Sequence, residues 1–196
     1  RSNLDVVVEE WLIAAVGVLN PLVRESPERV DEVLPTVRST VLSAMTDGLL
    51  AANERMTTLM RGDTTIKYVG SDQYVPLHLI DFADPAANRL VVSEEVVFGT
   101  PGKSRRFDIV LWVNGLPLVV IETKTPVKAS VSWLNAARDI ANTYETGHPS
   151  FFAPNVLCVA TEGREFHYGA VGQGAESWLM WGSTDDPYDL SGFERV

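Results

Sequence analysis

The chain has 196 residues, 45% of them hydrophobic and 21% charged, which is enough to bury the core of one sizeable domain or of two very small ones. Twenty-six acidic against 16 basic residues give a net charge of −10, which argues against a free-standing nucleic-acid binder with a basic surface. The single cysteine, Cys158, excludes an internal disulfide and favours a reducing, cytoplasmic setting, and no apolar run approaches the ~20 residues that span a membrane. The chain starts with Arg1, so we expect a fragment or a processed chain.

The first 60 residues predict helices. Ser26 is a good N-cap with Pro27 at the first helical position, and Pro35 is expected to break or restart the helix. Apolar residues three or four apart form one stripe before Ser26 and another after Pro35, namely Val7, Trp11, Ala15 and Val18, then Val37, Val41, Met45, Leu49, Ala52 and Met56. We therefore expect residues 1–60 to form a helical layer of the same domain as residues 61–196.

From about Ile66 the pattern changes to short runs of strand-forming residues separated by turn-forming ones. The candidate strands are Val75–Phe82, Leu90–Phe98, Phe107–Val113, Leu116–Glu122, Val156–Ala160 and Glu165–Tyr168. Asn114-Gly115, the strongest short hairpin signal, joins the third run to the fourth. A helix is expected between the fourth and fifth runs, capped by Ser130 or Ser132 and ended near Gly147. This order of elements predicts one α/β domain.

Several familiar signals are incomplete. The tripeptide Gly102-Lys103-Ser104 resembles the end of a phosphate-binding loop, but the first glycine of that loop would have to stand where Val97 is. The three histidines lie far apart and have no thiol partner, so zinc is not expected. Cys158 lies in an apolar run and is expected to be a small buried side chain rather than a nucleophile.

Asp108, Glu122 and Lys124 remain as candidates for chemistry. The run 116–121 is entirely apolar and is expected to be buried on both faces, so charges at its end lie where the core opens to solvent. Side chains alternate along a strand, so Glu122 and Lys124 project from the same face. Asp108 lies at the corresponding end of the partner strand, across the predicted hairpin.

The register of that hairpin decides whether the two carboxylates meet. A strict two-residue turn at Asn114-Gly115 places Asp108 opposite Ile121, which sends Glu122 to the other face. A bulge or a three-residue connection makes Asp108 and Glu122 direct or diagonal neighbours, with Cβ atoms ~5–8 Å apart. A shared site therefore requires an extra residue in this hairpin.

Two carboxylates at this distance repel each other unless a cation lies between them. Carboxylate oxygens favour Mg²⁺, or Mn²⁺, over softer metals. A lysine one side-chain length away can orient a water or stabilise negative charge that develops on phosphorus, so the three groups form a minimal device for hydrolysing a phosphodiester. The alternative is a surface ion pair of Lys124 with Asp108 or Glu122, worth about 0–1 kcal/mol.

The positive charges are unevenly distributed along the chain. Residues 101–128 hold five basic and two acidic residues, a local charge of +3 in a chain of −10. Contact with a phosphate backbone and a merely solvated surface are both open interpretations of this segment. The five bases are Lys103, Arg105, Arg106, Lys124 and Lys128.

The segment from Phe107 to Pro126, FDIVLWVNGLPLVVIETKTP, resembles the nuclease segment of the R (restriction) subunit of type I restriction enzymes, a family of the PD-(D/E)XK nuclease superfamily. The Asp, Glu and Lys of the family fall on Asp108, Glu122 and Lys124. Flanking stretches also resemble the family: Leu79–Phe82 with Asn88 before the motif, and Ala160–Gly163 after it. The resemblance covers roughly residues 49–169, and the first 48 residues are less distinctive.

This resemblance implies a fold, an activity and partners. The fold is a mixed central sheet flanked by helices, in which Asp108, Glu122 and the backbone carbonyl of Thr123 hold Mg²⁺, with Mn²⁺ as a possible substitute. The activity is that of an endonuclease domain, with Asp108, Glu122 and Lys124 as catalytic groups, that cuts DNA presented by an ATP-driven translocating complex. The expected partners are DNA, motor domains that follow in the full-length R subunit and use the ATP, and modification and specificity subunits.

Two departures from the family pattern leave parts of the site open. Relatives often carry Gln-x-x-x-Tyr on the helix after the lysine, where this chain has Ala136 and Ile140. The nearby polar residues are Asn135, Arg138, Asp139 and Tyr144, of which Arg138 or Tyr144 is the candidate substitute. Many relatives also place a Glu on an N-terminal helix near the metal, for which Glu10 is the first candidate and Glu9 the second. Thr123 stands where many relatives have Leu, a change expected to matter little if only its backbone is used.

Two other functions stay open from the sequence alone. One is a catalytically inert docking or interaction domain of the same assembly, and the other is a different PD-(D/E)XK nuclease that acts in repair or on RNA. Loss of metal binding when Asp108 or Glu122 is replaced would favour the nuclease over the docking domain. Recognition of a DNA sequence is not expected in this chain, because no helix-turn-helix, zinc finger or RNA-recognition motif is visible.

Overall fold

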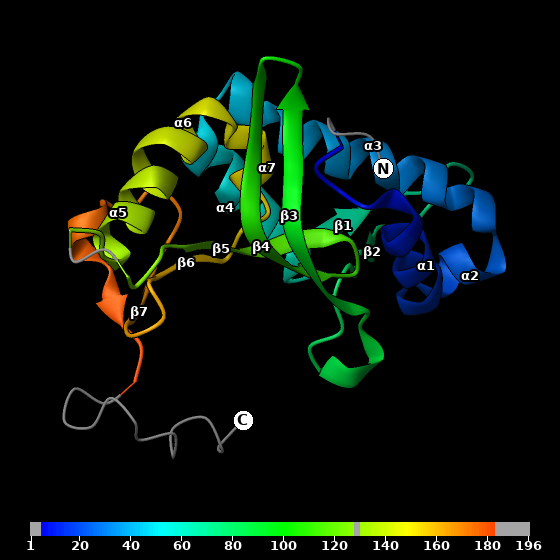
Figure 1. Ribbon diagram of the computed structural model, residues 1–196. Helices are drawn as coiled ribbons and strands as arrows, with labels where there is room; N and C mark the ends of the chain where they lie inside the picture. The colour runs from blue at the N-terminus through cyan, green and yellow to red at the C-terminus, as the bar shows by residue number, and fades with distance from the viewer. Residues whose placement is uncertain (1–4, 128–129, 183–196) are drawn as a thin grey trace.

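The computed structural model describes residues 5–127 and 130–182, so Lys128 lies outside the described residues. Within these ranges a six-stranded mixed sheet is flanked by helices, with a further group of helices at the N-terminal end (Figure 1). The predicted α/β fold class, a mixed central sheet flanked by helices with a helical N-terminal layer, is therefore confirmed. None of the described helices combines the length and the apolar character needed to cross a membrane.

The N-terminal layer contains four α-helices and two short 3₁₀ turns among the described residues. They are α1 (Glu9–Leu19), α2 (Pro21–Glu25), η1 (Pro27–Arg29), α3 (Val30–Leu42), η2 (Ser43–Met45) and α4 (Leu49–Met60). The predicted stripe on α1 is wrong, because this helix buries Leu12 and Val16 while Val18 is 67% exposed. Almost every residue of α1 after its two glutamates is apolar, so periodicity alone could not choose the buried face.

Helix α3 runs through Pro35, so the predicted break at this residue is wrong. A proline inside a helix removes one backbone hydrogen bond and strains the preceding turn. Here the residues on both sides of it, Val33, Leu34 and Val37, are buried in the core and hold the helix together. The apolar stripe predicted beyond Pro35 is instead divided between α3 and α4.

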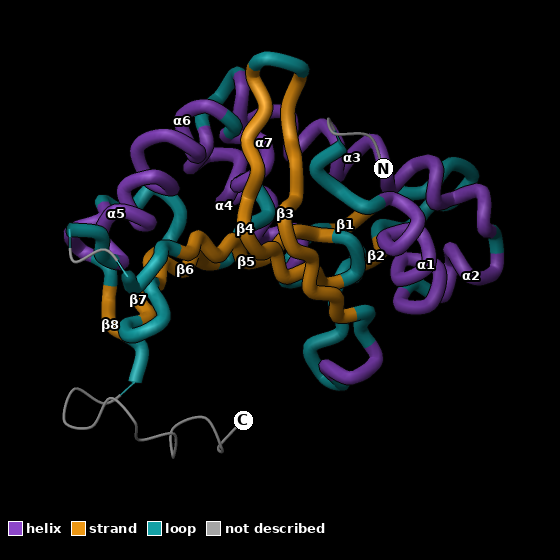
Figure 2. The backbone as a smooth tube through the Cα atoms, viewed as in Figure 1, coloured by secondary structure: helices purple, strands orange, loops and turns teal. Residues whose placement is uncertain are grey.

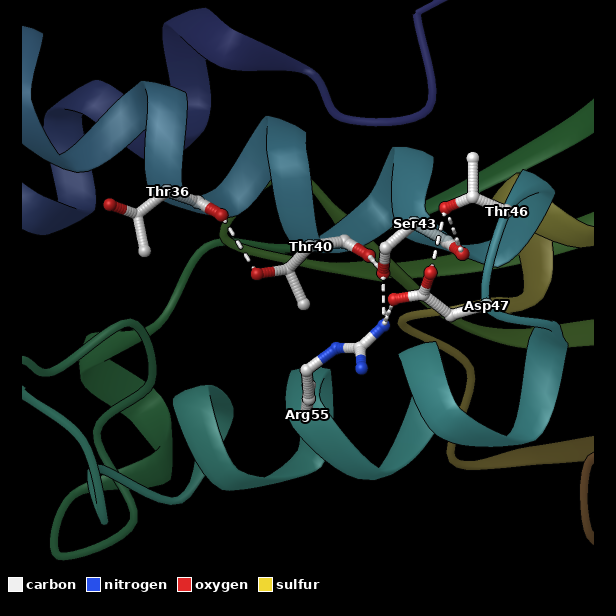
Figure 3. Close-up of polar contacts among 6 residues, drawn as sticks. All are labelled: Thr36, Thr40, Ser43, Thr46, Asp47 and Arg55. Carbon is white, nitrogen blue, oxygen red and sulfur yellow. Dashed lines mark hydrogen bonds and ion pairs between the residues drawn. The ribbon is translucent and has the colours of Figure 1, made fainter.

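The connection between α3 and α4 is held by polar contacts, shown in Figure 3. Arg55 on α4 donates hydrogen bonds to Ser43 Oγ (2.7 Å) and to Asp47 Oδ2 (2.6 Å). Gly48 has a φ of +91°, a backbone conformation that favours glycine, and helix α4 begins at the next residue. The turn leaves Met45, a member of the predicted stripe, 65% exposed.

The main sheet has the order β3-β4-β5-β6-β7-β8 among the described residues. Its strands are β3 (Leu90–Thr100), β4 (Lys103–Val113), β5 (Leu116–Thr123), β6 (Leu157–Thr161), β7 (Phe166–Gly169) and β8 (Leu179–Met180). Strands β5 and β6 are parallel and the other neighbours are antiparallel, which makes the sheet mixed. A separate pair, β1 (Thr65–Ile66) and β2 (Val75–Pro76), lies beside the N-terminal helices (Figure 2).

The predicted strand Val75–Phe82 is wrong beyond its first two residues. Pro76 lacks the N–H that a ladder needs, so the strand ends there. Leu77 and Leu79 are fully buried, so the apolar run anchors an irregular segment in the core instead of forming a strand. Asp81 then closes a turn by accepting hydrogen bonds from the backbone of Ala83 and Asp84.

The hairpin between β4 and β5 turns at Asn114-Gly115, as predicted. Both residues have positive φ, +51° and +85°, as the tight hairpin turn requires. The Asn114 side chain is buried and donates to Leu79 O (2.9 Å) and Asn88 Oδ1 (2.8 Å), so the flanking residues that resemble the family brace this turn. The backbone N–H of Val8 donates to Gly115 O (2.9 Å), which fastens the start of α1 to the same end of the hairpin.

A helical segment crosses from β5 to β6, and it is divided where the sequence predicted one helix. Its parts are α5 (Trp133–Arg138), the π-helix η4 (Asp139–Tyr144), α6 (Glu145–Gly147) and α7 (Pro149–Phe152). Ser132 stands at the N-cap, and its backbone N–H donates to Asn135 Oδ1 (2.9 Å). Phe107 on β4 stacks on Phe151 with ring centroids 4.4 Å apart, so this segment is packed directly on the sheet. In Figures 1 and 2, α4, α6 and α7 lie on one side of the strands.

Candidate active site

The two predicted carboxylates belong to residues on opposed strand positions because the hairpin contains a bulge. Near the turn Val113 pairs with Leu116 and Trp112 with Pro117, but Leu111 pairs with Val119, so Leu118 is an extra residue in β5. Beyond the bulge Ile109 pairs with Ile121, and the same register continued by one residue places Asp108 opposite Glu122. The extra residue that the shared site required is therefore present.

Asp108 lies on β4 where its pairing with β5 ends. Its Oδ2 accepts two hydrogen bonds from Thr123, one from the backbone N–H (2.9 Å) and one from the side-chain hydroxyl (2.7 Å). The sequence predicted a role for the backbone of Thr123 alone, so the contact made by this hydroxyl was not predicted. The signal in the sequence was a short side chain with a hydroxyl directly after Glu122, which could have indicated a hydrogen bond to a neighbouring carboxylate. The contact fixes the orientation of the Asp108 carboxylate.

Glu122 is the most buried charged group of the cluster, with 4% of its surface exposed. Its Oε1 accepts hydrogen bonds from Lys124 Nζ (2.7 Å) and Tyr144 Oη (3.1 Å), whereas its Oε2 is buried without a hydrogen-bond partner. Burial raises the pKa of Glu122 and the nearby Asp108 charge adds to this, while the contacts with Lys124 and Tyr144 oppose it. A buried oxygen of this kind is a place where a cation would be favourable.

Lys124 follows β5 directly, and its ammonium lies between two carboxylates. Its backbone N–H donates to Thr161 O (2.8 Å) on β6, and its Nζ contacts Glu122 Oε1 (2.7 Å) and Asp139 Oδ2 (2.8 Å). Burial disfavours the charge, but the hydrogen bonds to Asp139 and Glu122 outweigh it and raise the pKa of Lys124. The lysine is therefore a cation at neutral pH, suited to stabilising negative charge and not to accepting a proton.

The π-helix η4 brings two side chains to this cluster. Asp139 and Tyr144 are five residues apart, which would place them about 140° apart around an α-helix. The wider i→i+5 turn of a π-helix aligns them, so Asp139 reaches Lys124 and Tyr144 reaches Glu122. Burial and the Glu122 carboxylate raise the pKa of Tyr144 to about 12, so its hydroxyl remains a donor.

Of the residues considered as substitutes for the Gln-x-x-x-Tyr pattern, the structure brings Asp139 and Tyr144 into the cluster. Arg138 instead pairs with Glu176 (2.9 Å), and Asn135 bonds to the backbone at the start of α5. Glu162, in the flanking stretch that resembles the family, accepts a hydrogen bond from Trp133 N (2.9 Å) and so holds the start of this helical segment.

The two N-terminal glutamates are not brought to the cluster. Glu9 pairs with Arg38 (2.5 Å), and both Glu9 and Glu10 lie in the first turn of α1, beside the Asn114-Gly115 turn. Strand β5 separates that turn from Glu122 by six residues, or about 20 Å at 3.3 Å per residue. The candidate assignment of Glu10 or Glu9 to the site is therefore wrong in this structure.

The residues of the cluster fit a small hard cation. In the described ranges no group of three or more His, Cys, Asp and Glu side chains is placed to hold a metal ion, so an ion here would have to use two carboxylates with a backbone oxygen and water. Two carboxylates, one with a buried unpartnered oxygen, and a neighbouring backbone carbonyl match the few protein ligands that Mg²⁺ takes together with water. Sulfur and imidazole, the ligands of softer metals, are absent from these groups, and Cys158 is fully buried elsewhere in β6.

The fold and the cluster together define a nuclease-like α/β core: a mixed sheet flanked by helices, with Asp, Glu and Lys gathered where a bulged hairpin meets a parallel strand. A family model described as "Type I restriction enzyme R protein N terminus" matches residues 2–177. The chain belongs to this family.

Two relatives illustrate the similarity. The chain is 31% identical over 190 residues to the type I restriction enzyme HindI endonuclease subunit of Haemophilus influenzae. The aligned region covers 95% of this chain and 17% of that subunit. It is 25% identical over 122 residues to the putative type I restriction enzyme MjaIXP endonuclease subunit of Methanocaldococcus jannaschii. Here the aligned region covers 59% of this chain and 11% of that subunit. The chain thus spans less than a fifth of the length of these relatives.

Proposed function

We propose that this chain is a Mg²⁺-dependent endonuclease domain that hydrolyses phosphodiester bonds of DNA, with Asp108, Glu122 and Lys124 as its catalytic residues. The observation that carries the proposal is the buried, unpartnered Oε2 of Glu122, opposite Asp108 and beside the Lys124 ammonium. Two neighbouring carboxylates repel each other unless a cation lies between them, and a hard divalent cation takes oxygen ligands such as this unpartnered one.

Asp108, Glu122 and the carbonyl of Thr123 would hold the ion, and Mn²⁺ is expected to replace Mg²⁺. When bound, the ion supplies positive charge at the scissile phosphate and makes a water a stronger nucleophile. Lys124 remains protonated and places a second positive charge there, which stabilises the negative charge that develops on phosphorus. Asp139 and Tyr144 hold Lys124 and Glu122 in position.

Membership of the family supports a proposal about the wider context of the activity. The relatives are named endonuclease subunits and are much longer than this chain. We infer that DNA reaches the site from an ATP-driven translocating complex, with motor domains elsewhere in the R subunit and with modification and specificity subunits as partners. ATP would act only through those motor domains, and the setting would be cytoplasmic.

Calorimetry with Mg²⁺ and Mn²⁺, paired with a nicking assay on plasmid DNA, tests the proposal. The wild-type chain should bind the metal, and Asp108→Asn and Glu122→Gln should lose it. Lys124→Ala should retain metal binding while losing cleavage in the assembled complex, where translocation should continue. Metal binding that is unchanged in Asp108→Asn and Glu122→Gln would overturn the assignment and favour a catalytically inert docking domain.

A further inference from the structure

Strands β3 and β4 extend past the rest of the sheet as a two-stranded arm. Strand β5 pairs with β4 only between Ile109 and Val113, so residues 96–107 pair with each other alone. Figures 1 and 2 show this arm rising clear of the sheet to its turn at Pro101-Gly102. The side chains of residues 100–106 are exposed, although the arm begins beside Asp108 of the candidate site.

The two faces of the arm differ in charge compensation. On one face Phe107 is buried near Tyr144, and the guanidinium of Arg105 lies 5.6 Å from the centre of the Tyr144 ring. Strand alternation places Lys103 on this same face. On the other face Arg106 pairs with Glu95 (2.7 Å). In the described part of the chain, no ion pair joins Lys103 or Arg105 to an acid.

The face that carries Arg105, which we call the inner face of the arm, leads to the candidate site. The Tyr144 ring contacts Arg105, and the Tyr144 hydroxyl donates to Glu122, so a single side chain separates the guanidinium from the catalytic carboxylate. Elsewhere the body of the molecule is acidic, since the net charge is −10. Two exposed basic side chains without an acidic partner among the described residues therefore make this face of the arm suited to contact with a polyanion.

We propose that the inner face of the β3–β4 arm holds the phosphate backbone of double-stranded DNA beside the point of cleavage, with Arg105 and Lys103 as its phosphate contacts. The inference rests on the proposed nuclease function and adds to it how the substrate is held. Arginine suits the role because its planar guanidinium makes paired hydrogen bonds to phosphate. Phosphate contacts carry no sequence information, so the arm binds duplexes of any sequence.

The test measures binding of a fluorescent 20-bp duplex to the chain by anisotropy, in EDTA to prevent cleavage, over a series of NaCl concentrations. Each phosphate contact contributes about −0.9 to the slope of log affinity against log salt. Arg105→Ala and Lys103→Ala should each reduce the slope by about 0.9, and the double variant by about 1.8. Arg106→Ala, which removes the same charge from the other face of the arm, is the matched control and should leave the slope unchanged.

Arg105→Lys separates a phosphate contact from mere packing on Tyr144. It keeps the charge, so the salt slope should stay near that of the wild-type chain, whereas a packing role predicts a loss as large as in Arg105→Ala. No duplex binding by the wild-type chain at 20 mM NaCl, or equal effects of the Arg105, Lys103 and Arg106 variants, would overturn the inference.

Calorimetry with Mg²⁺ keeps this inference distinct from the nuclease assignment. Lys103→Ala and Arg105→Ala should bind Mg²⁺ as the wild-type chain does, because neither residue is a metal ligand. If the chain cleaves DNA normally with both arm residues replaced, the proposed role of the arm is wrong and the nuclease assignment stands. If the chain binds DNA through the arm but binds no metal at Asp108 and Glu122, the nuclease assignment is wrong and the role of the arm stands.

Discussion

At the scale of single residues, the charge of the cluster explains its geometry. Asp108, Glu122 and Asp139 contribute three negative charges and Lys124 one positive charge, so the four groups carry −2 when ionised. The lysine is already shared between two of the carboxylates and leaves Glu122 Oε2 without a partner. A divalent cation between Asp108 and Glu122 would compensate this charge, which is why we propose a metal site here and not a structural ion pair.

Thr123 offers a test of how firmly Asp108 must be held. Thr123→Val keeps the β-branched shape and the backbone N–H but removes the hydroxyl that donates to Asp108 Oδ2. Losing a partner that orients a metal ligand typically costs 10–100-fold in metal affinity, so we expect the dissociation constant for Mg²⁺ to rise by at least about tenfold. Calorimetry measures it, with Thr123→Ser as the control that restores the donor. Equal affinity in Thr123→Val would mean that the backbone N–H alone orients Asp108.

The raised pKa of Glu145, which lies outside the candidate site, predicts that the stability of the chain depends on pH. Burial raises the pKa of Glu145 to about 7 from its usual 4.5, although the backbone N–H of Gly172 donates to its carboxylate. Between pH 4.5 and 7 the folded chain holds a proton there that the unfolded chain has released, so stability falls as the pH rises through this window. The full effect of such a shift is on the order of 3 kcal/mol.

Glu145→Gln removes the ionisation, so this contribution to the pH dependence should disappear. We expect the variant to match the wild-type chain in free energy of unfolding at pH 5 and to exceed it above pH 7, by up to about 3 kcal/mol. Urea denaturation at the two pH values measures the difference. A variant with the same pH profile as the wild-type chain would show that another group causes the decline.

At the scale of elements, the turn of the β4–β5 hairpin determines the strand register at the candidate site, which lies at the other end of the hairpin. The turn at Asn114-Gly115 fixes the register near the loop, and the extra residue Leu118 changes it once, so Asp108 and Glu122 become opposite neighbours. The start of α1 rests on the turn, and a Cβ built on Gly115 would lie 2.3 Å from Val8 O. The N-terminal layer and the hairpin are therefore coupled through a single glycine.

Gly115→Ala should destabilise the chain more than an ordinary glycine replacement at positive φ. A residue with a side chain in this backbone region costs roughly 1–2 kcal/mol, and here the contact with Val8 O adds a clash with backbone. Gly102→Ala, at a φ of +79° with open space around it, is the matched control and should cost only the first part. Thermal unfolding compares the two, and equal losses would contradict a tight contact between α1 and the turn.

Sequence patterns predicted the elements whose signals are local. The Asn-Gly turn, the strands around it and the need for an extra residue in the hairpin all follow from residue type and alternation, and the structure has them. The position of the bulge at Leu118 did not follow, because any residue of an all-apolar strand satisfies the pattern. The same uniformity concealed the buried face of α1.

The π-helix could not be predicted for a different reason. An α-helical spacing treats Asp139 and Tyr144 as residues on different faces, so the sequence offered them only as separate candidates. Their shared approach to Lys124 and Glu122 depends on how η4 packs against the sheet, with Tyr144 in contact with Phe107. Backbone contacts at long range, such as the hydrogen bond that the Lys124 N–H donates to Thr161 O, likewise form only when β6 pairs with β5.

At the scale of the whole molecule, the net negative charge of the chain contrasts with the basic residues of the β3–β4 arm. A chain with a net charge of −10 repels DNA in general, which is why we propose that the few bases of the arm and partner subunits supply the attraction. The chain covers 17% of the length of the HindI subunit, so most of that relative lies outside the compared region. This charge distribution agrees with the proposal that other parts of a restriction complex deliver DNA to the domain.

The stability of the whole molecule should respond to Mg²⁺ through the same two carboxylates. A ligand that binds only the folded chain stabilises it by about 2.7 kcal/mol at a free concentration 100 times its dissociation constant. We expect Mg²⁺ to raise the unfolding midpoint of the wild-type chain, and to have no such effect on Glu122→Gln. Because any salt also screens the repulsion within a chain of −10, NaCl of equal ionic strength is the control for both proteins. If Mg²⁺ shifts both midpoints equally after this correction, the ion acts on the general charge of the chain, and Glu122 is not its ligand.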